Sequence, residues 1–208
     1  MVKKLTQSQM SGKTASFQKF PSDYSACIPK IWLHLRTGSA GFNMGRSSQS
    51  KIQNRREFMA LNNTPDLTKK PPRSARVRLG GYVILPRMLD KGRATIGGKN
   101  GDYNYACPLD ERFLEFAGID PQALKKELAA GKGDGEILDW VQKHAKNKHT
   151  EPEIAVWSEF AEQRVPGDAE SRSFFNELHQ KAAPKREDIR TWFDLLDVDD
   201  YVSFGGKA

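Results

Sequence analysis

Cysteine is almost absent from this sequence of 208 residues, which contains only Cys27 and Cys107. The two lie far apart and form no C-x-x-C pair, so the sequence predicts neither a disulfide framework nor a structural zinc site. So little cysteine is typical of a reducing compartment, and we expect a cytoplasmic protein.

Long apolar runs are also missing. No stretch approaches the roughly 20 apolar residues that cross a membrane, and the basic start of the chain lacks the apolar segment of a signal peptide. We therefore expect no membrane partner.

The familiar cofactor and metal motifs are absent as well. The glycines at 131, 133 and 135 match neither phosphate-binding pattern, and they fit a helix end followed by a helix start. His144 and His149 have no zinc-binding spacing, so we expect His144 to be half-buried and His149 to be solvated. We predict no cofactor and no bound metal.

The positive charge is unevenly distributed. Residues 1–58 carry ten Lys and Arg against two acids, and residues 69–99 carry nine against one, whereas residues 100–208 have a net charge of −8. We call residues 69–99 the basic strip. Two interpretations stay open: the strip binds an outside partner, or it packs on the acidic remainder of the chain.

Residues 1–58 are rich in Ser, Gln, Gly and Lys and show no long periodicity, so we expect a disordered basic extension. The composition changes at Met59. Either translation starts at Met59, or the extension is a basic arm for nucleic acid or a membrane surface. We expect residues 59–208 to form a single helical domain.

From residue 86 onward, Pro and Asp at helix starts and Gly at helix ends divide the chain into short amphipathic segments. They predict an all-α array of six to seven helices with short Gly/Pro/Asp loops, and at most one short hairpin or strand near 102–107. The fifth helix should bury Ile154, Trp157, Phe160 and Ala161. The predicted helices span 86–96, 108–117, 121–130, 135–145, 151–164, 169–183 and 185–200.

In the first of these helices, Met88 and Leu89 should face the core, and Arg87, Lys91 and Arg93 should take the other faces. "GGKNGD" is a turn, after which Tyr103 and Tyr105 would project to one side of an extended segment. The acids of "DVDD", Asp197 to Asp200, are unfavourable at a helix C-terminus, and ion pairs to the basic strip would explain them.

Several segments together resemble a known family: "PPRSARVRLGGYVILPRMLDKGRA", "GDYNYACPLDERFLEFAGI", "GKGDGEILDW" and "TWFDLLDVDDYVSFG". They are similar to a bacterial family catalogued as domain of unknown function 5069, over about residues 64 to 206. The resemblance implies a stand-alone domain and implies no activity.

Cations interleaved with tyrosines suit an anionic ligand or a partner surface. We therefore predict a binding or interaction module that uses the Arg/Lys/Tyr face of residues 73–105. Its predicted ligand-binding residues are Arg87, Asp90, Lys91, Arg93, Tyr103 and Tyr105.

Two alternatives remain. One is an enzyme for a small anionic substrate, with Cys107, Asp90 or Tyr105 as the reactive group. The other is nucleic-acid binding through the strip, at Arg73, Arg76, Arg78 and Lys99. The sequence does not distinguish a protein partner from a small anionic ligand.

Overall fold

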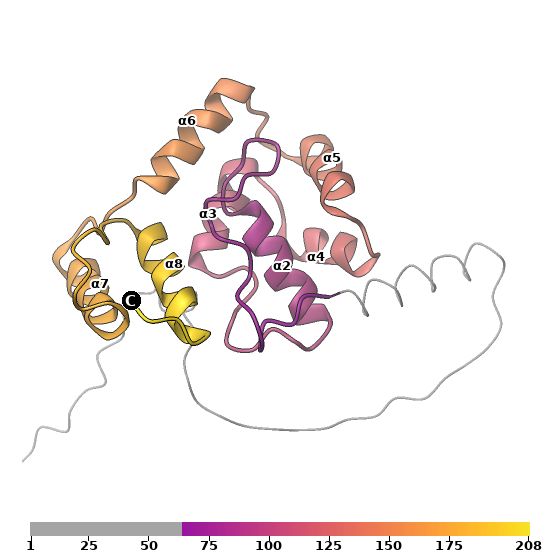
Figure 1. The fold of residues 1–208 in the computed structure, drawn as a ribbon. Helices are drawn as coiled ribbons and strands as arrows, with labels where there is room; N and C mark the ends of the chain where they lie inside the picture. The colour runs from indigo at the N-terminus through magenta and orange to yellow at the C-terminus, as the bar shows by residue number, and fades with distance from the viewer. Residues whose placement is uncertain (1–63) are drawn as a thin grey trace, which may run out of the picture.

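The structure is a computed structural model, and it describes residues 64–208 (Figure 1). The predictions for residues 1–58 and for a start at Met59 lie outside this range. The described part contains seven α-helices and no β-strand, which confirms the all-α prediction. The helices are α2 (Leu85–Ile96), α3 (Pro108–Ala117), α4 (Pro121–Ala129), α5 (Asp134–His144), α6 (Glu151–Glu162), α7 (Ala169–Ala182) and α8 (Trp192–Ser203).

Local chemistry sets most of these boundaries. Asp120 caps α4 by accepting a hydrogen bond from Ala123 N at 2.7 Å, and Asp168 caps α7 through Ser171 N in the same way. Gly118 follows α3 in the left-handed conformation, with φ of 64°. Side chains with a Cβ disfavour that conformation, so glycine is the natural residue there.

The start of α8 differs from the prediction. The chain was expected to be helical from residue 185, but α8 begins at Trp192. Thr191 caps it by accepting from Asp194 N at 3.1 Å, while Asp194 accepts from Thr191 N at 2.8 Å. This reciprocal capping box, rather than the apolar pattern, fixes the boundary.

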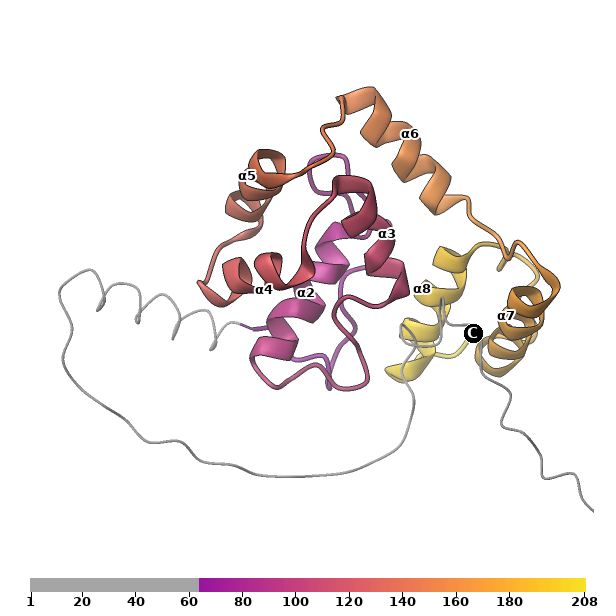
Figure 2. The ribbon, with the colours of Figure 1, turned by 180° about the vertical axis from the view of Figure 1, so that it is seen from behind.

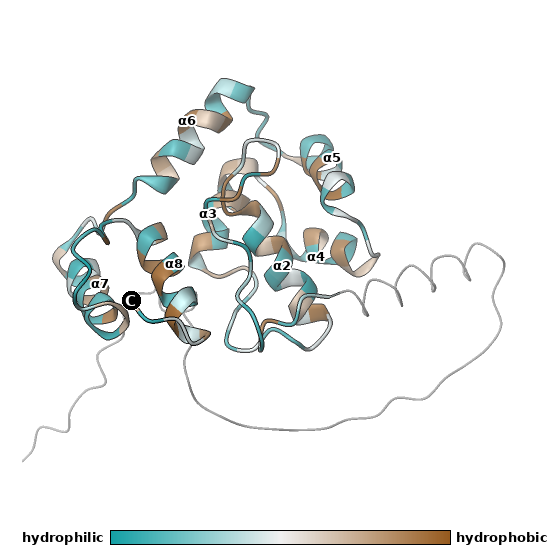
Figure 3. Cartoon of the chain, viewed as in Figure 1, coloured by the Kyte–Doolittle hydropathy of each residue, from teal (hydrophilic) through white to brown (hydrophobic). Residues whose placement is uncertain are grey.

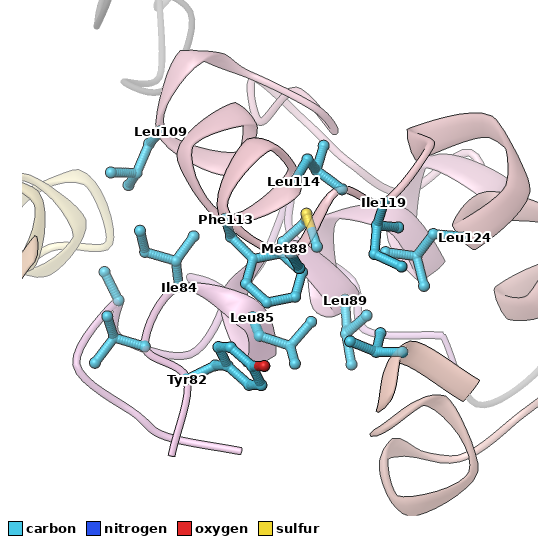
Figure 4. Packing of buried hydrophobic residues seen from close by; sticks show 14 of the residues in the cluster. Tyr82, Ile84, Leu85, Met88, Leu89, Leu109, Phe113, Leu114, Ile119 and Leu124 are labelled. Carbon is cyan, nitrogen blue, oxygen red and sulfur yellow. The ribbon is translucent and has the colours of Figure 1, made fainter. Parts of the chain in front are cut away.

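Helix α2 lies at the centre of the molecule, with α3 and α4 against it in both views (Figures 1 and 2). Its Met88 and Leu89 are fully buried, as predicted. They pack with Phe113 of α3 and Leu124 of α4 in one hydrophobic cluster (Figure 4). Close packing of this cluster is the main source of stability for helices that are too short to persist alone.

Helices α7 and α8 pack against each other around a second, smaller cluster. Phe175 of α7 meets Trp192 of α8 edge to face, with ring centroids 5.3 Å apart. This pair places the acidic second half of α8 beside the central helix α2 (Figure 1).

A tight turn precedes α2. Leu79 and Tyr82 exchange two backbone hydrogen bonds across Gly80 and Gly81, both of which have positive φ. Ser158 of α6 fixes this turn, because its hydroxyl donates to Gly81 O at 2.8 Å and accepts from Val83 N at 3.3 Å.

The segment 102–107 forms no strand. Ala106 has a φ of 55°, which breaks an extended conformation. Tyr103 and Tyr105 consequently do not share one surface: Tyr103 is buried, and Tyr105 is half-buried against Gly92 with its hydroxyl on Pro121 O at 2.9 Å.

Among residues 64–208, no helix combines the length and the apolar character needed to cross a bilayer.

Candidate functional site

The cations of α2 lie inside the protein. Arg87 and Lys91 are each only 1% exposed, so the expectation that they take solvent-facing sides of the helix is wrong. Helix α2 contacts α3 and α4, its Arg87 reaches Asp200 of α8, and most of its residues are buried, so nearly the whole circumference of the helix is enclosed. A periodicity argument that assigns one face to the core does not anticipate this.

Arg87 is held by the end of α8. Its guanidinium donates to both carboxylate oxygens of Asp200, at 2.6 and 3.1 Å, and lies over the ring of Tyr103 at 5.5 Å. The Tyr103 hydroxyl donates to Asp200 Oδ1 at 2.8 Å. Burial raises the pKa of the Tyr103 hydroxyl, and the neighbouring Asp200 charge raises it further, so the phenol stays protonated.

Lys91 is enclosed one turn further along. Its ammonium lies 2.8 Å from Asp110 Oδ2 and donates to Cys107 Sγ at 3.1 Å. Burial lowers the pKa of Lys91 and raises the pKa of Asp110, so it opposes both charges. Asp110 also accepts from Cys107 N, which ties the pair to the start of α3.

A second group of charges includes Asp90 and Arg93 of α2. Arg73 binds Asp90 through two hydrogen bonds at 2.8 and 2.7 Å and binds Asp134 at 2.6 Å. Arg93 donates to the other oxygen of Asp134 at 2.7 Å. Burial alone would raise the pKa of Asp134, but the hydrogen bonds from Arg73 and Arg93 outweigh it and lower the pKa.

Two more arginines of the strip also contact acids. Arg76 binds Asp194 and, at 3.2 Å, Asp197, and Arg78 binds Glu162 at 2.7 Å. Lys99 is half-buried, and its backbone links to Leu67 and Ala94.

The five arginines of the basic strip contact the protein's own acids, as the second interpretation expects. The ion pairs of Asp197 and Asp200 confirm the expected explanation of the "DVDD" acids. The predicted site residues fall into two groups, with Arg87, Lys91 and Tyr103 inside and Asp90 and Arg93 joined through Arg73. A ligand on Arg87 or Lys91 would have to replace Asp200 or Asp110.

Helix α6 departs most from expectation. Phe160, predicted to be buried, is 64% exposed, and Val156 is 70% exposed. Ser158 occupies the core-facing position instead, where it binds the glycine turn. Apolar and polar residues alternate along α6 in Figure 3. A signal was present in the sequence, because Val156 lies about 160° around the helix from Ile154, so that one stripe cannot bury both.

Beside Phe160 lies a hollow of about 350 Å³, whose floor includes Phe116 and Trp157. These two rings stack with centroids 4.6 Å apart and 9° between their planes. Aromatic side chains that line a hollow beside an exposed aromatic side chain suit an apolar side chain from another molecule.

The α5–α6 loop forms the wall of a second cavity, of about 460 Å³, which faces the Gly80–Gly81 turn. Here the histidine expectations are reversed: His144 is exposed and His149 is half-buried. His149 Nε2 donates to Phe116 O at 2.8 Å, and the Asn147 amide donates to Glu115 O and Phe116 O. The loop therefore caps the C-terminus of α3.

Within residues 64–208, no group of three or more His, Cys, Asp or Glu side chains is arranged to hold a metal ion.

Comparison of the sequence with curated proteins gives no match. A family model described as "Domain of unknown function (DUF5069)" matches residues 69–202, which include every described helix apart from the last residue of α8. The chain belongs to this family.

Proposed function

We propose that this domain is a protein-interaction module that docks a basic amphipathic helix of a partner on α6. The docking surface is the row of Pro152, Val156 and Phe160, which we call the α6 ridge. The exposure of Val156 and Phe160 carries the proposal.

Scattered apolar side chains on a surface are ordinary, but a contiguous row beside a hollow is a mark of an interaction site. Val156 and Phe160 are one helical turn apart, and Phe160 borders the hollow over Phe116 and Trp157. A helix with apolar side chains at i, i+3, i+4 and i+7 fits such a surface.

The charges that flank the ridge itself specify the partner, because Arg112 and Arg164, which line the hollow, already have interactions within the protein. At 3.6 residues per turn, Glu153 and Glu159 lie about 60° to either side of Val156. Both are exposed and both are absent from the ion pairs formed among residues 64–208. An apolar row between two acids complements a partner helix that carries Leu or Phe on its contact face and Lys or Arg along the edges.

The ion pairs of the basic strip support a binding surface on α6 and not on the strip. A polyanion needs cations that are free to neutralise phosphates. Arg73, Arg76 and Arg78 already bind the protein's own carboxylates. Nucleic-acid binding and a site for an anionic substrate on the strip stay predictions without structural support.

The test uses two designed helical peptides with the same Leu pattern, one with Lys and one with Glu at the remaining positions. Isothermal titration of the full chain should give a dissociation constant in the micromolar range for the Leu/Lys peptide, as expected for a small transient interface. The Leu/Glu peptide should not bind.

Phe160→Ala should weaken binding of the Leu/Lys peptide by about tenfold or more, because aromatic anchors dominate small interfaces. Val77→Ser is the matched control, since Val77 is exposed but lies on the basic strip. Equal binding of both peptides, or no effect of Phe160→Ala, would contradict the proposal.

A further inference from the structure

The cavity between the glycine turn and the α5–α6 loop is a second candidate binding site, separate from the α6 ridge. Its volume of about 460 Å³ lies in the range of small-molecule sites. Tyr82 and the turn form one wall, Asn147 and His149 form another, and Glu151 and Ile154 of α6 close it. Ile154 lies on the face of α6 opposite Val156, so a ligand here would not touch the ridge.

The walls are fixed before any ligand arrives. Asn147 N bonds Ala117 O at 3.3 Å, and the His149 ring stacks on Phe116 at 3.8 Å. On the opposite side, Ser158 fixes the turn. A site whose walls do not need ordering loses little affinity to conformational entropy.

The hydrogen bonds that fix the loop also decide which atoms remain for a ligand. The Asn147 amide nitrogen uses both of its hydrogens on Glu115 O and Phe116 O, which leaves its Oδ1 as an acceptor. His149 Nε2 must carry a hydrogen because its partner is a carbonyl oxygen, so in the neutral ring Nδ1 is also an acceptor. The Glu151 carboxylate adds further acceptor atoms to this wall.

The facing wall is different. The Tyr82 ring packs edge to face against Phe113 at 5.2 Å, but its hydroxyl makes no hydrogen bond to the described residues. Burial raises the pKa of Tyr82, so this hydroxyl remains a donor as well as an acceptor. Gly80 and Gly81 line the same wall, and their N–H groups take no part in the two bonds that close the turn.

We propose that this cavity binds a small planar molecule through a carboxamide or amidine group. Its N–H groups would donate to the acceptors of Asn147, His149 and Glu151. The apolar body of the ligand would rest on Ile154. Lys148 also lines the cavity, but its ammonium is held by the backbone oxygens of Gln142 and Lys143. A carboxylate of the same shape would place its oxygens against the acceptors of Asn147 and His149 and against the negative charge of Glu151, and it should be rejected.

The probes are benzamide, benzamidine and benzoate, which share one ring and differ in the polar group. Titration into the full chain, followed by amide chemical shifts in NMR, should move the signals of residues 80–82 and 145–154 with benzamide and benzamidine. Dissociation constants near 1–10 mM are expected for molecules of this size. Benzoate should leave these signals unchanged.

Two variants test whether the Tyr82 hydroxyl and the Glu151 carboxylate contact the probes. Tyr82→Phe removes the hydroxyl and keeps the aromatic packing, and it should weaken both N–H probes by about two- to tenfold. Glu151→Gln, at an exposed position, should weaken benzamidine more than benzamide because only benzamidine is charged. Glu159→Gln on the ridge side of α6 is the control and should change neither.

Binding of benzoate equal to that of benzamide would overturn the proposal. So would shifts confined to residues outside the cavity, or an absence of shifts with both N–H probes. Because these measurements do not involve the α6 ridge, they can fail while the peptide titration succeeds, and the reverse also holds.

Discussion

The imidazole of His149 lies almost parallel to the phenyl ring of Phe116, with 3.8 Å between centroids and 4° between planes. Phe116 in turn stacks on Trp157. These three rings run from the wall of the cavity to the floor of the hollow beside the α6 ridge. The C-terminus of α3 thus supports both candidate binding sites.

Gly118 is the residue that allows the loop to approach α3. A Cβ at this position would lie 2.9 Å from Lys146 Cβ and 3.2 Å from Asn147 N, and φ is 64°. Gly118→Ala should therefore lower the free energy of unfolding by about 1–2 kcal/mol or more, measured by urea denaturation. Gly135→Ala, in α5 with nothing within 4 Å of the added carbon, should raise it by about 0.5 kcal/mol. Equal effects of the two changes would contradict this account of Gly118.

Removing one member of the Arg87–Asp200 pair should lower the free energy of unfolding more than replacing both members with apolar residues. Arg87→Met leaves Asp200 buried with Tyr103 as its remaining hydrogen-bond partner among the described residues, so we expect a loss of about 3–5 kcal/mol. The double variant Arg87→Met with Asp200→Leu removes both charges and should recover a large part of that loss. Chemical denaturation of Arg87→Met, Asp200→Leu and the double variant measures this difference. If the double variant loses as much as the sum of the single variants, the pair is not the reason for the loss.

Asp199 should make stability depend on pH. Burial first, and then the charge of Asp200, raise the pKa of Asp199 to about 6, and one of its oxygens has no hydrogen-bond partner among residues 64–208. The folded state therefore binds this proton more tightly than the unfolded chain, where the pKa is near 3.9. The stabilisation is complete below about pH 4 and is lost as the pH rises through 6.

Asp199→Asn mimics the protonated carboxyl. It should match the parent protein at pH 4 and exceed its free energy of unfolding by about 1–2 kcal/mol at pH 7.5, after allowance for partial exposure. Asp139→Asn, at an exposed position of α5, is the control and should show no such divergence. Parallel pH profiles for Asp199→Asn and the parent protein would show that Asp199 is not the source of the pH dependence.

Local signals in the sequence identified the helices well. Asp120, Asp168 and Gly118 mark helix ends because capping and left-handed backbone need only neighbouring residues. The opposite charges of the strip and of the later helices also indicated their pairing in general terms. The partners themselves could not be predicted, because Arg87 and Asp200 are joined only when the whole chain is folded.

The errors have a common cause. We predict a buried Phe160 because its side chain is apolar, and we place Lys91 away from the core because its side chain is charged. The position of each residue in the fold, however, decides its burial. Lys91 is buried because Asp110 compensates its charge, and Phe160 is exposed because Ser158 is needed against the glycine turn. Each of these contacts joins residues that lie far apart in the sequence, so the pattern around Lys91 or Phe160 does not reveal it.

The central claim is that α6 carries an apolar ridge that the fold itself does not need. Urea denaturation of Phe160→Ala beside Phe113→Ala tests it most directly. We predict a change within about 1 kcal/mol for Phe160→Ala, because the ring is already in water, and a loss of about 3–5 kcal/mol for the fully buried Phe113. A loss for Phe160→Ala as large as that for Phe113→Ala would show that Phe160 belongs to the core, and the proposed docking surface would be refuted.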